Sequence, residues 1–247
     1  MILFSRTLCV FACTASLSAL ATPSFDSLTI RSTEISAPNE HEFRTVSIDP
    51  VTGVRTDRQF QQSDINGWEL KFSEQISENS YWTAGYRNDR SSSSENTQIY
   101  QPSPITISTL SQHTRFSTRQ YSLGAGYIFD LSKNTTLDFS GNIGRLKLKT
   151  KDVTRYGTEQ SSQTYWQDDH NYTTIAGYQA RVRHEFGDDI EFYATIGGER
   201  WYADTEDTVR VQTVGLNYFI FGDTAISFEY GKYDDEARTA IGAHFRF

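Results

Sequence analysis

The chain has 247 residues, a formal net charge of -8 and a mean hydropathy of -0.55. No basic patch or basic tail stands out in the sequence, so we predict no nucleic acid among its partners. The length allows one barrel, or one to two ordinary domains. The low hydropathy does not exclude a membrane protein, because a membrane β-barrel places only alternate residues in lipid.

Residues 1–21 have the pattern of a cleaved secretory signal peptide. Arg6 supplies a positive charge, residues 8–20 are mostly apolar, and an Ala-Leu-Ala sequence ends the segment as a cleavage site. The apolar run is shorter than the ~20 residues that a membrane-spanning helix needs. Lipidation at Cys13 is an alternative. Cys9 and Cys13 both lie in the signal, so we expect no disulfide and no cysteine-metal site in the mature chain.

Beyond the signal, apolar and polar residues alternate in short segments separated by turn residues, which is the pattern of β-strands. No helical segment is predicted that could cover the apolar faces. The pattern therefore favours an all-β fold, an antiparallel up-and-down transmembrane β-barrel with an apolar exterior and a polar lumen. We predict ten strands, at about residues 25–35, 64–75, 81–89, 119–131, 135–148, 172–186, 190–202, 208–221, 224–233 and 238–247.

The strand predicted at 172–186 shows the alternation most clearly. Ala180 and Val182 fall on its apolar face, whereas Arg181, Arg183 and Glu185 follow one another on the polar face. Three ionisable side chains in a row could not point into a dry core without partners. In the wet lumen of a barrel they can pair and hydrate, so this strand favours an inside-out barrel over a soluble sheet.

The connections between the predicted strands alternate in length. Short links follow the second, fourth, sixth and eighth strands, whereas long polar segments follow the first, third and fifth, at about 36–63, 90–116 and 149–171. A transmembrane barrel has an even number of strands, short periplasmic turns and longer outer loops. Residues 22–247 are therefore predicted to form one barrel with three long outer loops. The first strand is the weakest prediction, so the range is eight to twelve strands.

Aromatic residues gather at both ends of the predicted strands, as expected for two membrane interfaces. The predicted outer girdle consists of Tyr86, Tyr121, Tyr172, Trp201, Tyr202, Tyr230 and Tyr233. The predicted periplasmic girdle consists of Phe72, Phe129, Phe186, Phe192, Phe221 and Phe247.

The last strand carries a sequence signal. Gly242-x-x-Phe245-x-Phe247, ending on an aromatic residue, resembles the C-terminal signature of bacterial outer-membrane β-barrel proteins. One departure is Ala240, where that signature usually has a polar residue. The resemblance implies an outer-membrane location in a Gram-negative-type bacterium and recognition by the barrel-assembly machinery.

The alternation also predicts which charged side chains face the lumen. They could line a selective channel, or they could fill the barrel as a salt-bridge network. A barrel of about eight strands is nearly filled by its own side chains and a large aqueous channel needs about sixteen, which favours the filled lumen. The predicted lumen-facing charged residues are Glu69, Lys71, Arg87, Asp138, Arg181, Arg183, Glu185, Glu191, Glu199, Glu229 and Arg246. Glycines on the same face, such as Gly126 and Gly215, indicate close packing in a curved sheet.

The third long loop contains a candidate contact site made of Tyr165, Trp166, Asp168, Asp169 and His170. Exposed aromatic residues often anchor interfaces. The neighbouring acids and histidine could instead handle a proton, as in an acid–base cluster. Omptin proteases resemble this arrangement in architecture and residue type only, so no catalytic residue is predicted. The sequence has no metal-ligand spacing and no nucleotide-binding motif, and we predict no cofactor.

The sequence thus predicts a non-enzymatic outer-membrane barrel that acts as a surface-loop scaffold or as a narrow, porin-like channel. Its expected partners are outer-membrane lipid, the assembly machinery and a surface ligand or small solute. Two alternatives remain: an outer-membrane hydrolase, either an omptin-like protease or a lipid-modifying enzyme, and a soluble periplasmic β-barrel binding protein.

Overall fold

The computed structural model describes residues 25–36, 42–102, 105–158, 161–202 and 206–247. The predicted signal peptide at 1–21 lies outside these ranges, as do short parts of the three predicted loops. Within the described ranges, no helix is long and apolar enough to cross a membrane. The strands are β1 (Ser27–Ser36), β2 (Glu42–Ile48), β3 (Arg55–Gln62), β4 (Ile65–Ser77), β5 (Ser80–Pro102), β6 (Ile105–Ser132), β7 (Thr135–Thr158), β8 (Ser161–Phe186), β9 (Ile190–Tyr202), β10 (Glu206–Phe221), β11 (Thr224–Tyr233) and β12 (Glu236–Arg246).

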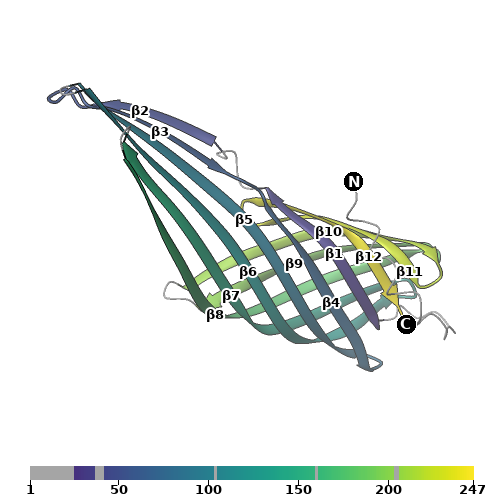
Figure 1. Ribbon diagram of the computed structural model, residues 1–247. Coiled ribbons are helices and arrows are strands. Elements are labelled where there is room, and N and C mark those ends of the chain that lie inside the picture. The colour runs from purple at the N-terminus through teal and green to yellow at the C-terminus, as the bar shows by residue number, and fades with distance from the viewer. Residues whose placement is uncertain (1–24, 37–41, 103–104, 159–160, 203–205) are drawn as a thin grey trace.

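Ten of these strands form a closed antiparallel barrel. β1 pairs with both β12 and β4, the strands β4 to β12 pair in chain order, and the β5–β6 pairing completes the ring (Figure 1). The predicted ten-stranded barrel is confirmed. Closure leaves no unpaired strand edge within the ring, which is what a barrel in lipid requires.

The barrel is apolar outside and polar inside. On β10 and β11, Leu216 and Phe228 are exposed on the outer wall, whereas Asn217 and Ser227 beside them are buried in the interior. Their register pairs Leu216 with Phe228 and Asn217 with Ser227, so paired residues share a face. A soluble protein would bury the apolar set, and this arrangement matches a wall that faces lipid.

Aromatic side chains form two rows on the outer wall. Tyr86 lies 4.9 Å from both Trp68 and Tyr121, measured between ring centroids, near the outer end of the barrel. At the opposite end Phe72 packs against Phe247 at 5.8 Å. These rows correspond to the predicted girdles.

Two members of the predicted outer girdle face the interior instead. Tyr233 lines the interior cavities, and the indole nitrogen of Trp201 donates a hydrogen bond to the interior carboxylate of Glu199. Both occupy odd-numbered positions on strands whose even-numbered residues face outwards. The prediction was wrong for these two because it followed position along the strand and ignored which way the side chain points.

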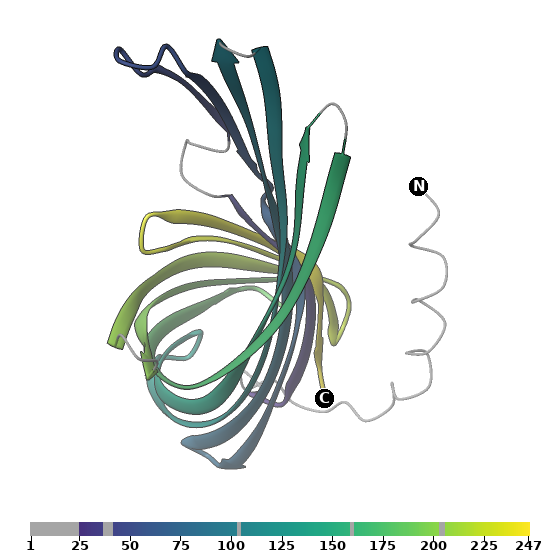
Figure 2. The ribbon, with the colours of Figure 1, turned by 60° about the vertical axis from the view of Figure 1, so that its left-hand side comes forward.

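Four strands are far longer than a membrane crossing requires. β5, β6, β7 and β8 contain 23, 28, 24 and 26 residues, whereas a crossing takes about 9–11. Their outer halves continue beyond the ring, and the β2–β3 hairpin joins them by pairing β3 with β5 (Figure 1, Figure 2). We call this six-stranded extension, β2-β3-β5-β6-β7-β8, the outer sheet.

The three segments that the sequence predicts to be long loops are largely strands of the outer sheet. Where described, the segments at 36–63, 90–116 and 149–171 are mostly strand. Their sequences lack an apolar face because outside lipid neither face of a strand must be apolar. The main-chain hydrogen bonds between neighbours nevertheless continue without interruption from the barrel into the outer sheet.

Candidate functional site: the charged barrel interior

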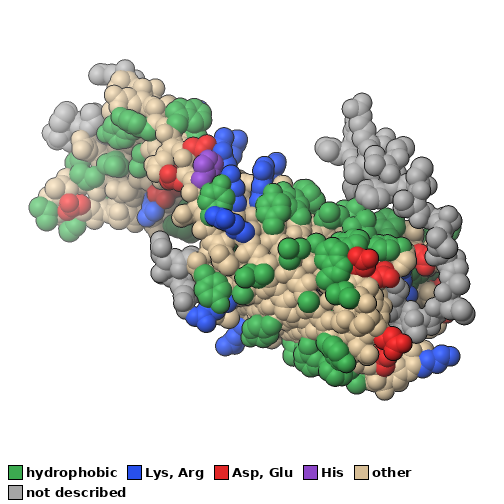
Figure 3. Space-filling view, turned by 90° about the horizontal axis from the view of Figure 1, so that it is seen from below, with side chains coloured by type: hydrophobic (Ala, Val, Ile, Leu, Met, Phe, Trp, Pro, Cys, Tyr) green, Lys and Arg blue, Asp and Glu red, His purple; other side chains and the backbone are tan. Residues whose placement is uncertain are grey.

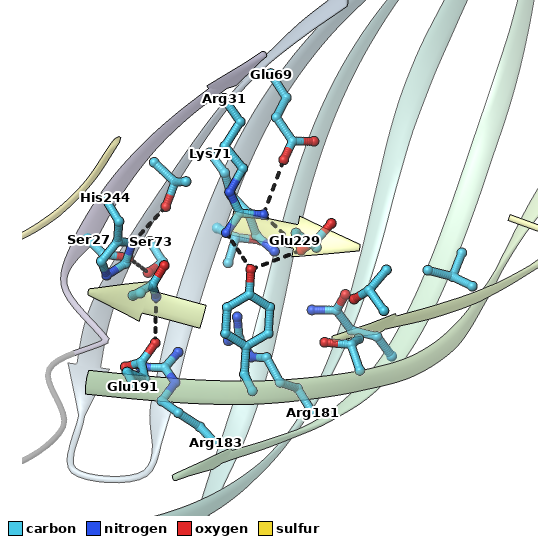
Figure 4. Close-up of a pocket in the computed structure, with 18 of the residues that line it drawn as sticks. Ser27, Arg31, Glu69, Lys71, Ser73, Arg181, Arg183, Glu191, Glu229 and His244 are labelled. Carbon is cyan, nitrogen blue, oxygen red and sulfur yellow. Dashed lines mark hydrogen bonds and ion pairs between the residues drawn. The ribbon is translucent and has the colours of Figure 1, made fainter. Parts of the chain in front are cut away.

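Arg31 on β1 is the centre of the interior network. Its guanidinium donates hydrogen bonds to Glu229 on β11 at 2.8 Å, to Tyr193 on β9 at 2.7 Å and to Ser227 at 3.1 Å. It also lies 3.5 Å from Glu69 on β4. β9 is the fourth strand round the ring from β1. The contact between Arg31 and Tyr193 therefore bridges two nearly opposite walls, and Figure 4 shows the Arg31 side chain extending into the lumen.

Arg238 on β12 completes this central cluster. It forms ion pairs with Glu69 and, at 3.5 Å, with Glu229, and it donates a hydrogen bond to the hydroxyl of Tyr233. Two arginines thus share two glutamates, and all four side chains are at least four-fifths buried. Buried charges need this mutual neutralisation, because an unpaired one would be strongly unfavourable.

A second cluster spans the end of the lumen that lies away from the outer sheet. Arg246 on β12 contacts Glu185 on β8 at 2.7 Å and Glu191 on β9 at 2.6 Å. Arg183 lies 3.5 Å from Glu191 and 4.3 Å from the centre of the Phe25 ring. Phe25 precedes β1, and β8 is the fifth strand from β1, directly across the ring. These contacts therefore connect opposite walls.

A third cluster lies under β5 and β7. Asp138 is fully buried; it accepts a hydrogen bond from the Tyr81 hydroxyl at 2.6 Å and pairs with Arg181 at 2.8 Å. Tyr81 also packs with Phe25 and Ile128 in a small apolar core inside the barrel. This core occupies lumen volume that a pore would leave to water.

Two small cavities remain between these clusters. They have volumes of about 140 and 130 Å³, and both are lined by Glu69, Lys71, Tyr233 and Arg238. Towards the outer end, the Gln120 amide bridges from β6 to Glu199 on β9 at 3.1 Å. The interior thus holds pockets large enough for a few waters, separated by side chains that bridge the lumen.

The structure places the eleven charged residues predicted for the lumen in these clusters or along the two cavities. Sequence reasoning missed Arg31 and Arg238 as members of the set, although both fall on the polar face of their strands. It also missed the hydroxyls of Tyr81 and Tyr193. The face of each residue was available from the alternation, but which side chains meet across the lumen depends on closure of the ring.

The predicted contact site at Tyr165, Trp166, Asp168, Asp169 and His170 lies on the outer part of β8. Alternation along the strand divides it: Trp166, Asp168 and His170 share one face, and Tyr165 and Asp169 lie on the other. His170 lies 3.8 Å from Asp168, but Asp169 points to the other face, so the two aspartates and the histidine do not form a three-residue cluster. Within the described residues, no group of three or more His, Cys, Asp or Glu could hold a metal ion.

Asp168 instead pairs with lysines of the neighbouring strand β7. Its carboxylate lies 3.1 Å from Lys149 and 3.9 Å from Lys151. Desolvation acts to raise the pKa of Asp168, but the hydrogen bond and charge of Lys149, with Lys151 and His170, outweigh it and lower that pKa below its ordinary value. Asp168 is therefore ionised at neutral pH and offsets part of the lysine charge.

The residues of the C-terminal signature lie on β12 and just after it. Phe247 stacks on Phe72, and Gly242 packs so closely on the backbone of β1 that a Cβ would overlap the carbonyl of Ile30. Gly242 thus has a packing role in the closed ring. Recognition of Phe245 and Phe247 by an assembly machinery stays a prediction.

Comparison with known proteins gives structural relatives only. No protein-family profile and no curated protein sequence matches the chain. The translocator domain of the autotransporter NalP from Neisseria meningitidis aligns with a TM-score of 0.45 and 10% identity, over 91% of this chain and 90% of that one. An outer membrane channel from Pseudomonas putida F1 aligns with a TM-score of 0.44 and 8% identity, over 92% and 97%. The outer membrane protease OmpT from Escherichia coli aligns with a TM-score of 0.42 and 11% identity, over 91% and 95%.

Proposed function

We propose that this protein is a non-enzymatic outer-membrane barrel that carries the outer sheet at the cell surface and whose lumen is closed. The observation that carries the proposal is the set of side chains that bridge opposite walls, above all Arg31 with Tyr193 and Arg183 with Phe25. Because these contacts lie at different heights, an ion would have to displace more than one of them. The apolar outer wall between two aromatic rows supports the membrane location.

The first test is conductance of the folded chain in a planar bilayer, after a heat-modifiable gel shift has shown folding. We expect no discrete current steps from the unsubstituted protein. The double variant Arg31→Ser/Tyr193→Ser removes the central bridge and should give small steps or brief openings. Reproducible steps from the unsubstituted protein would contradict a closed lumen.

A narrow channel is the second candidate, and the two cavities favour it. They share Glu69, Lys71 and Arg238, so rearrangement of these few side chains would join them. This candidate predicts steps whose ion selectivity changes with Lys71→Gln. A current that is absent, or that is unaffected by Lys71→Gln, would argue against it.

The surface role is tested by labelling single cysteines on intact cells. Val51 lies in the β2–β3 turn at the far end of the outer sheet and is 91% exposed. We expect Val51→Cys to react with a membrane-impermeant maleimide. Lys133→Cys, in the exposed β6–β7 turn at the other end of the barrel, is the matched control and should react only after the cells are opened. The reverse pattern would contradict the proposed orientation.

A further inference from the structure

Seven cations gather on the outer wall where the barrel continues into the outer sheet. We call them the basic belt: Arg90, Arg115, Arg119, Arg145, Lys147, Lys149 and Lys151. The register sets Arg119 beside Lys147 and Arg115 beside Lys151, and it pairs Ser117 with both Arg90 and Lys149. Figure 3 shows Lys and Arg side chains gathered where the barrel meets the outer sheet.

The basic belt faces outwards, like the lipid-facing wall. Arg115 and Arg119 lie at even spacing from Tyr121 and Leu123, which are exposed on β6. Lys147, Lys149 and Lys151 have the same relation to the exposed Ile143 on β7. The side chains of the basic belt therefore lie on the outer wall, whereas the paired charges described above point into the lumen.

The height of the belt is fixed by the aromatic row below it. Tyr86, Tyr121 and Arg145 lie level in the register, and Arg119 with Lys147 form the next row up. Two further rows follow, so the belt above the tyrosines extends for about 14 Å along the strands. Aromatic rings mark the boundary between hydrocarbon and headgroups, which places the belt at headgroup level.

Most of the belt is not neutralised by the protein. Asp168 pairs with Lys149 and Lys151, but within the described residues no carboxylate forms an ion pair with the other five cations. Arg145 and Lys147 lie over the Tyr172 ring at 5.1 and 5.3 Å. This surplus positive charge occurs in a chain of net charge -8. The equivalent end of β11–β12 has an acidic turn, Asp234-Asp235-Glu236.

A recess of about 510 Å³ lies within the belt. Four cations, Arg90, Arg115, Lys149 and Lys151, line it together with Ser92, Ser117 and one carboxylate, that of Asp64. Guanidinium, ammonium and hydroxyl groups are the donors that phosphate oxygens accept most strongly. A phosphate group held at membrane height would meet these donors at the level set by the tyrosines.

We propose that the basic belt binds the phosphate-bearing headgroup of an anionic lipid in the outer leaflet. The proposal rests on the membrane position given under Proposed function, but not on whether the lumen conducts. Each Lys or Arg near an anionic surface adds attraction, which falls as salt concentration rises. Lipid bound there would pack against β5–β8 and hold the base of the outer sheet at a set height above the membrane.

The test uses the full folded chain in a non-ionic detergent, titrated with lipid A, a glycolipid that bears two phosphates. Bound lipid is counted by native mass spectrometry. The variant Arg115→Gln/Arg119→Gln should weaken binding by about tenfold or more. Its matched control is Arg210→Gln/Lys232→Gln, which removes two exposed cations from the outer wall of β10 and β11, with Lys232 one row above Tyr230. This control should bind as the unsubstituted protein does.

Equal loss of binding in both variants, or none in either, would overturn the proposal, because affinity would then not depend on the belt. Phosphatidylcholine should not compete with lipid A. Inorganic pyrophosphate that binds as tightly as lipid A would identify a site for free phosphate and would also overturn it. Folding and membrane insertion are checked separately by the heat-modifiable shift and by flotation with vesicles, so failure of the barrel itself would be recognised.

Discussion

The lumen and the basic belt differ in how their charged side chains are paired. In the lumen, Arg31 and Arg238 share Glu69 and Glu229 as partners. In the basic belt, Asp168 pairs with Lys149 and Lys151, and no carboxylate of the described residues forms an ion pair with the other five cations. Charges that serve the fold are paired within the chain, because burial makes an unpaired charge costly. Exposed charges cost little when unpaired, so the belt can keep its charge for an external ligand.

This comparison predicts that the same substitution acts differently in the two regions. Arg31→Met should lower the free energy of unfolding by about 3–5 kcal/mol, because Glu229 and Glu69 lose a buried cation. Arg119→Met in the belt should change it by only about 0.5 kcal/mol. Urea titration of the protein refolded into neutral vesicles measures both. Similar values for the two variants would mean that the lumen is hydrated enough to replace Arg31 with water.

Adding an arginine to the outer wall tests the height assigned to the belt. Leu216→Arg places a cation in the middle of the apolar band and should cost about 2–4 kcal/mol. Gln212→Arg lies on the same face of β10, near the outer interface, and should cost about 0–1 kcal/mol. The same urea titration gives the difference. Equal costs would show that the membrane boundary has been placed wrongly along β10.

Substitution of two glycines by alanine should distinguish the tightly packed lumen from the open outer wall. A Cβ at Gly215 would overlap the Tyr193 ring, which holds Arg31, so Gly215→Ala should cost about 1–3 kcal/mol. Gly141 lies on the outer wall, where a Cβ would be 3.7 Å from the nearest atom, and Gly141→Ala should be nearly neutral. Conductance provides a second readout, since displacing Tyr193 should also disturb the central bridge.

The barrel could be predicted from sequence because lipid imposes a simple rule on each crossing. Every second residue from Ile226 to Tyr230 must be apolar, so periodicity reveals both the strand and its face. No such rule holds beyond the membrane. β6 continues outwards through Thr114 and Gln112 by main-chain pairing alone, and a polar strand of that kind resembles a loop in sequence.

The candidate site was predictable in residue type but not in connectivity. The polar face of β12 indicates that Arg238 points inwards, but nothing in the sequence shows that it meets Glu69 on β4, because the two become neighbours only when the ring closes. The basic belt illustrates the same limit. β7 alone contributes four of the seven cations, at every second position from Arg145 to Lys151. Only the strand register shows that β5 and β6 place the other three beside them.

The smallest predicted effect concerns Asp168, whose carboxylate is paired with two lysines of the belt. Asp168→Asn leaves the strand pairing intact and frees Lys149 and Lys151, so lipid A should bind about two- to fivefold more tightly.

Lowering the pH should also make the unsubstituted protein bind lipid A more tightly. The folded-state pKa of Asp168 is lowered, so its pairing with the lysines is present at neutral pH and is lost only as pH falls through that lowered value, below the ordinary range of an aspartate. The gain from Asp168→Asn should therefore be seen at pH 7 and shrink only when the pH falls below the ordinary range of an aspartate, where the unsubstituted Asp168 becomes protonated. A variant that binds lipid A more weakly would mean that Asp168 orders the two lysines for the phosphate and does not compete with it.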